Sequence, residues 1–117
     1  MLMKRAEDLG RMVGQSEEYQ ALKRANDHLM ADTALTGQLE QLQRAQLRVA
    51  ELLEKGQEPP AEIRGEMDRL MSTVQANPLY QGIVVAQSGF DKLMAKVNEQ
   101  ILEGIRLGAE SRIITLS

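Results

Sequence analysis

Apolar residues recur every three or four positions along almost the whole chain, which is the period of an α-helix that buries one face. The clearest run lies in 77–108, where the spacings alternate between four and three residues: Leu79, Ile83, Ala86, Phe90, Leu93, Val97 and Ile101. Asn77 suits an N-cap, and Pro78 suits the first helical position, where a missing N–H costs nothing. The sequence therefore predicts a helix over 78–108, roughly 45 Å long, whose heptad-like apolar face needs partner helices.

Turn and capping signals divide the rest of the chain into four shorter predicted helices: 2–13, 16–33, 35–55 and 60–76. Ser16 suits the N-cap of the second helix, and Lys55-Gly56 is a typical C-terminal signal. Gly37 leaves open whether 35–55 is one helix or two. The residues 109–117 are expected to form a tail, either a frayed terminus or a short apolar segment that docks on a partner or adds an edge strand.

These elements predict one all-α domain over 1–117, an antiparallel helical bundle of four to five helices with a long C-terminal helix. Short loops favour antiparallel neighbours, and a core with only three aromatic residues suits helices better than a β-sandwich. Because the last helix is longer than a compact monomer of this size can cover, we expect it to be intertwined in a homo-oligomer. The residues expected to form the core or the self-association surface are Leu79, Ile83, Phe90, Leu93, Val97 and Ile101.

Composition removes several classes of function. The net charge is −3, and acids and bases alternate along every segment, which argues against direct nucleic-acid binding. The chain has no cysteine, so disulfides and thiolate metal sites are excluded. No apolar run is long enough for a membrane span, and the first residues lack the apolar region of a signal peptide. A cytoplasmic location is therefore expected.

Polar residues do not assemble into a recognisable catalytic pattern. His28 is the single histidine and forms an i, i+4 pair with Asp32, which is typical of a helix surface and would need a further ligand to hold a metal. The carboxylate pairs Glu62/Glu66 and Glu99/Glu103 lack the Glu-x-x-His motifs of di-metal bundles. We therefore assign no catalytic residue, no cofactor and no metal site, and we do not expect an enzyme.

Two blocks of the sequence resemble the YlbF/YmcA family, which includes the YheA-type proteins. The first block resembles the second helix of that family and consists of Ser16-Glu17-Glu18-Tyr19 followed by Ala25, Leu29 and Asp32. The second resembles its long last helix and consists of Asn77-Pro78 followed by Ala86-Gln87, Leu93, Val97-Asn98, Ile101 and Ile105. The spacing between the blocks also fits the family.

This resemblance implies a small bacterial cytoplasmic regulator that self-associates and has no enzymatic activity. Relatives act in sporulation, competence, biofilm formation and mRNA processing, so the implied partners are copies of itself, other family members, a PSP1-type protein and ribonuclease Y. The complex of those relatives is associated with iron–sulfur clusters held by cysteines. This chain has no cysteine and cannot supply such ligands.

The resulting hypothesis is a non-enzymatic helical adaptor or regulator that acts through protein–protein interaction as a homodimer or higher oligomer. The alternative is a purely structural oligomerisation module without a regulatory partner. Contacts with a partner are expected at Tyr80 and in the C-terminal segment, at Ile113, Ile114 and Leu116.

Replacing Val97 with aspartate should break self-association, because an unpaired charge within an apolar helix interface is expensive to bury. The measurement is the solution mass by light scattering, compared between the wild type and the variant. The hypothesis fails if both proteins are folded monomers.

Overall fold

The computed structural model describes the backbone of residues 1–116 and the side chains of residues 1–110. Its five helices are α1 (Leu2–Gly14), α2 (Glu17–Ala31), α3 (Thr33–Glu54), α4 (Ala61–Ala76) and α5 (Pro78–Leu116). No strand occurs within the described residues. The prediction of an all-α fold is therefore confirmed.

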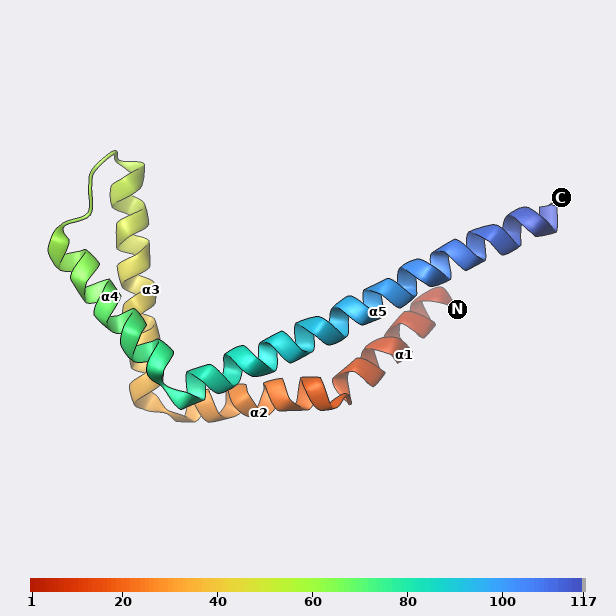
Figure 1. Cartoon of the computed structure of the whole chain (residues 1–117), viewed down its shortest axis with the longest axis horizontal. Coiled ribbons are helices and arrows are strands. Elements are labelled where there is room, and N and C mark those ends of the chain that lie inside the picture. The colour runs from red at the N-terminus through yellow and green to blue at the C-terminus, as the bar shows by residue number, and fades with distance from the viewer. Residues whose placement is uncertain (117) are drawn as a thin grey trace.

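The helices form two arms (Figure 1). In the long arm, α1 and α2 run along one side of α5, while α3 and α4 pair in a short arm that projects from one end. The chain measures 70 × 37 × 20 Å and its radius of gyration is 21.8 Å, against about 13 Å for a compact domain of 100 residues. A single chain therefore does not form one compact bundle, because neither arm packs along the length of the other. The predicted antiparallel bundle, intertwined in a homo-oligomer, stays a prediction.

The two arms meet where the chain turns sharply at two single residues. Asp32 alone separates α2 from α3, and its carboxylate accepts a hydrogen bond of 2.9 Å from the backbone N–H of Leu35. Asn77 alone separates α4 from α5, and its side-chain oxygen accepts one of 2.9 Å from the N–H of Leu79. Each residue thus ends one helix and caps the next, so no loop residues separate the two helices beyond the cap itself.

The buried core lies at this junction. Leu29, Leu35 and Val74 form the central cluster, and four half-buried apolar residues pack against it: Leu39, Leu79, Tyr80 and Ile83. Among the described side chains, the buried aliphatic core is completed by Leu22 alone. A chain of 117 residues is long enough to bury most of its surface in one compact domain. Four buried aliphatic residues therefore make a very small core.

Two helix boundaries answer questions that the sequence left open. α3 is one continuous helix through Gly37. α5 does not end at 108, because the helix continues to Leu116 and leaves no separate tail within the described backbone. Gly56 adopts a φ of 73°, as expected of the residue that follows a helix, whereas Gly108 stays helical. Arg106 also bonds to Glu103 and Glu110, which bridges the predicted end point.

Replacing Leu35 with alanine should lower the free energy of unfolding by about 2–5 kcal/mol, because the side chain is fully buried and would leave a cavity. The matched control is Leu47→Ala on the same helix, since Leu47 is 58% exposed and should matter little. Both are measured by urea denaturation at one fixed protein concentration. Equal losses for the two variants would contradict the placement of the core at the junction.

Candidate interaction surface

The long arm is held together where α2 packs against the first half of α5. Ser16 caps α2 by accepting a hydrogen bond of 3.1 Å from the N–H of Tyr19. The Tyr19 ring meets the Phe90 ring edge-on, with centroids 5.7 Å apart and planes at 61°, which is a favoured aromatic geometry. This contact sets the antiparallel register of the two helices.

The residues predicted for the core or for self-association are less buried the further along α5 they lie. Leu79 and Ile83 pack against the core cluster, and Phe90 packs against Tyr19. Leu93 and Val97 are half-buried, whereas Ile101 is 44% exposed. The apolar face of α5 is thus covered at its start and open toward its far end.

An open groove lies between α1 and α5, lined by Leu9, Lys96, Val97, Gln100 and Ile101. We call it the α1–α5 groove. The axes of two packed helices lie about 8–10 Å apart, and each Cα atom lies about 2.3 Å from its own axis. Some Cα atoms of two packed helices therefore come within about 8 Å of each other. Within the described parts of α1 and α5, no pair of Cα atoms comes that close. α1 therefore stands off α5, and the apolar side chains between them do not close into a core.

A second groove runs between α2 and α5, with small residues on both walls: Ala21, Ala25, Gly82 and Ala86. Val85 forms part of its lining and is 72% exposed. A Cβ atom added at Gly82 or Gly89 would meet nothing within 4 Å. The packing of this single chain therefore does not require glycine at either position.

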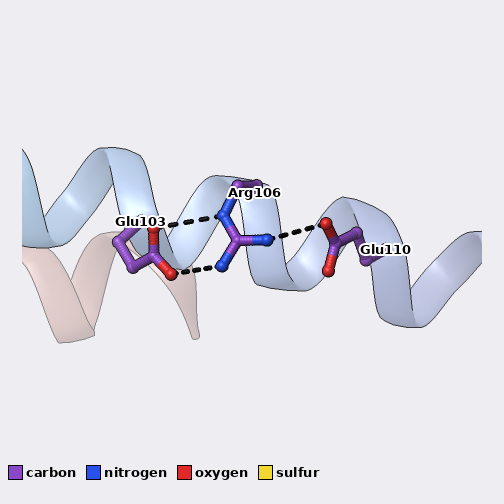
Figure 2. A network of polar contacts seen from close by, with 3 residues as sticks. All are labelled: Glu103, Arg106 and Glu110. Atoms are coloured by element: carbon purple, nitrogen blue, oxygen red, sulfur yellow. Dashed lines mark hydrogen bonds and ion pairs between the residues drawn. The ribbon is translucent and has the colours of Figure 1, made fainter.

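Charged groups at the far end of the long arm are paired within their own helices. Arg106 donates from Nη1 to Glu110 at 2.7 Å, from Nε to Glu103 at 3.1 Å, and from Nη2 to the second oxygen of Glu103 (Figure 2). These bonds hold the pKa of Glu103 below its ordinary value and raise the pKa of Arg106. On α1, Arg11 pairs with Glu7 at 2.6 Å.

These charges lie away from the apolar faces. Successive helical residues turn by about 100°, so Arg106 and Glu110 lie on the opposite side of α5 from Ile101. By the same geometry, Arg11 lies opposite Leu9 on α1. The paired arginines of α1 and α5 therefore lie on a different side of each helix from Leu9 and Ile101.

The polar residues do not converge on a reaction centre. His28 is exposed beside the small-residue groove, and the Asp32 carboxylate serves to cap α3. Within the part of the chain that the structure describes, no three potential metal ligands lie close enough to hold an ion. No described helix is both long and apolar enough to cross a membrane.

The residues predicted for partner contact fall in different places. Tyr80 is half-buried against the core cluster, which leaves it only partly available. The side chains of Ile113, Ile114 and Leu116 lie outside the described residues. Sequence reasoning did not single out Leu9, although its helical spacing with Leu2 and Val13 signals an apolar face on α1.

This geometry defines the class of the protein: an all-α, two-armed chain that presents apolar helix faces. A model of the family described as control of competence regulator ComK, YlbF/YmcA, matches residues 2–106. The chain belongs to this YlbF/YmcA family, as the resemblance of its two sequence blocks indicated.

Two relatives carry the name UPF0342 protein. One, from Desulfitobacterium hafniense strain Y51, is 29% identical over 104 residues, which cover 89% of this chain and 79% of the relative. The other, from Leuconostoc citreum strain KM20, is 21% identical over 100 residues, which cover 86% and 85% respectively. The similarity thus extends over more than three quarters of each protein.

Replacing Arg106 with glutamine should return the pKa of Glu103 toward its ordinary value, because the bonds from the guanidinium are lost. In the wild type, the Glu103–Arg106 bond contributes its full stabilisation at pH values above the ordinary pKa of a glutamate. This contribution is lost as the pH falls through the lowered pKa of Glu103. An NMR titration of the glutamate side-chain carbons measures the change. Arg69→Gln on α4 is the control and should leave Glu103 unchanged.

Proposed function

We propose that this protein is a non-enzymatic helical adaptor that acts through protein–protein interaction, beginning with copies of itself. The observation that carries the proposal is its surface area. One chain of 13.1 kDa exposes 9219 Å², whereas a compact monomer of that mass exposes about 6,400 Å². If each of two chains buried this excess of about 2,800 Å², the total of about 5,600 Å² would lie at the upper end of the range for obligate homodimers.

The apolar character of this surface supports the same reading. Large apolar side chains are exposed along both α1 and α5, while Arg11 on α1 and Arg106 on α5 are paired with carboxylates of their own helices. An adaptor needs such faces because apolar area removed from water drives helix association. A surface for nucleic acid would instead present unpaired basic groups.

Family membership supports a regulatory role. The family description names control of a competence regulator, and we carry that role to this chain as part of the proposal. Other family members, a PSP1-type protein and ribonuclease Y are the partners that this role suggests. The proposed place of action is the bacterial cytoplasm.

A catalytic role has no comparable support. Catalytic groups normally converge in a cleft and have perturbed pKa values. The pKa values of Glu103 and Arg106 are shifted by an exposed ion-pair network on one helix. Such a network is typical of a solvated helix face.

The solution mass should be at least twice the 13.1 kDa of one chain, and capture of the tagged protein from its native host should recover a second protein. Light scattering and mass spectrometry of the captured material are the two measurements. A monomeric mass at all concentrations contradicts self-association. Recovery of the protein alone contradicts the adaptor role and favours the structural oligomerisation module. A metal that co-purifies and is lost in His28→Ala would contradict the non-enzymatic assignment.

A further inference from the structure

We propose that the α1–α5 groove is the site where a second copy of this chain docks, and that the occupant is the far end of the partner's α5. This inference rests on the proposed self-association and specifies its surface. Each copy would place the apolar face of α5 beyond Val97 against the groove of the other copy.

The first argument is that the chain's own α1 does not cover this part of α5. Tyr19 faces Phe90, and Leu9 faces the stretch from Val97 to Ile101. α1 runs antiparallel to α5, and both helices rise by the same distance per residue. Met1 therefore lies level with about residue 107 of α5. α5 continues to Leu116, past the N-terminus, as Figure 1 shows. Its last turns therefore have no partner helix in the chain.

The second argument is the distribution of exposed apolar side chains. Half of the large apolar residues that are exposed among residues 1–110 lie at this end of the long arm: Met1, Leu2, Met3, Ile101, Leu102, Ile105 and Leu107. They come from both helices that border the groove. Ile101 and Ile105 lie about 40° apart around α5 and therefore share one face of the helix. Exposed apolar residues gathered at one end of an arm are typical of an interaction surface.

The third argument is the location of the charges. Arg106 and Glu110 lie on the side of α5 opposite Ile101, and Arg11 lies on the side of α1 opposite Leu9. Figure 2 shows that Arg106 is paired with Glu103 and Glu110 of its own helix. Lys96 is the one charged residue in the lining of the groove, and its long side chain can keep the ammonium group in water at the rim. An apolar helix can thus enter without burying an unpaired charge, and no charge there selects a nucleic acid or an acidic peptide.

The fourth argument selects a second copy as the occupant. A two-fold arrangement requires a self-complementary surface, and this end of the arm offers both an open apolar groove and the exposed apolar residues Ile101 and Ile105 on α5. Each copy would supply what the other lacks. The combined α1 and α5 helices would form a four-helix bundle, and the excess of about 2,800 Å² per chain is large enough for the stable interface that such a bundle needs.

The test compares charged substitutions inside and outside the proposed interface. Ile101→Glu and Ile105→Glu should weaken self-association at least about tenfold, because each carboxylate would be buried without a partner. Val84→Glu and Val85→Glu are the matched controls, since these residues are also exposed on α5 but lie outside the groove. They should change the dissociation constant less than about threefold. Sedimentation equilibrium gives the constants.

All four side chains are between 44% and 72% exposed in the single chain, so the variants should fold, and circular dichroism checks that they do. Association that survives Ile101→Glu and Ile105→Glu but is lost in Val85→Glu overturns this inference in favour of the small-residue groove, while the proposed self-association stands. A wild type that is monomeric overturns both. Intact self-association in all four variants overturns the inference alone.

Cysteine cross-linking tests the occupant directly, because the chain has no cysteine of its own. A mixture of Leu9→Cys and Ile105→Cys proteins should form a disulfide-linked pair of the two variants under mild oxidation. A mixture of Leu9→Cys and Val85→Cys proteins is the control and should not. Equal cross-linking in both mixtures contradicts the proposed docking.

Discussion

The structure depends on one imbalance: α5 carries more apolar face than the rest of the chain can cover. At 39 residues, the helix is about 58 Å long, whereas α2 covers its first half and α1 stands off the remainder. Hydrophobic burial is the main favourable term in folding, so a helix left half covered leaves much of that free energy unrealised. The small core and the large exposed area are two consequences of the same shortfall.

The two corner residues fix where this shortfall lies. Asp32 and Asn77 each cap one helix directly after another ends, so α3 and α4 must leave the long arm together. The apolar residues of α3 and α4 pack against each other and against the junction around Leu35 and Val74. The short arm therefore contributes nothing to the far end of α5, and the uncovered face lies at the end opposite the core.

The sequence predicts the helices well because the signals are local. Ser16, Gly56 and Asn77 each act on their own turn of helix, and the observed boundaries at these points lie within two residues of the predicted ones. The end of α5 was missed because Gly108 resembles a stop signal, yet its backbone stays helical. The sequence did not reveal the arrangement in two arms, since it depends on the direction in which the chain turns at Asp32 and Asn77. The sequence also placed Leu79 and Ile101 on one apolar face, but the distance between α1 and α5 decides that Leu79 is covered and Ile101 is not.

The glycines of α5 bear on the same imbalance. Gly82 and Gly89 each weaken a helix interior by about 1 kcal/mol relative to alanine, and a Cβ atom at either position would meet nothing within 4 Å in this chain. The packing of a single copy therefore offers no compensation for the loss. Glycine at a helix surface does permit close approach by another backbone.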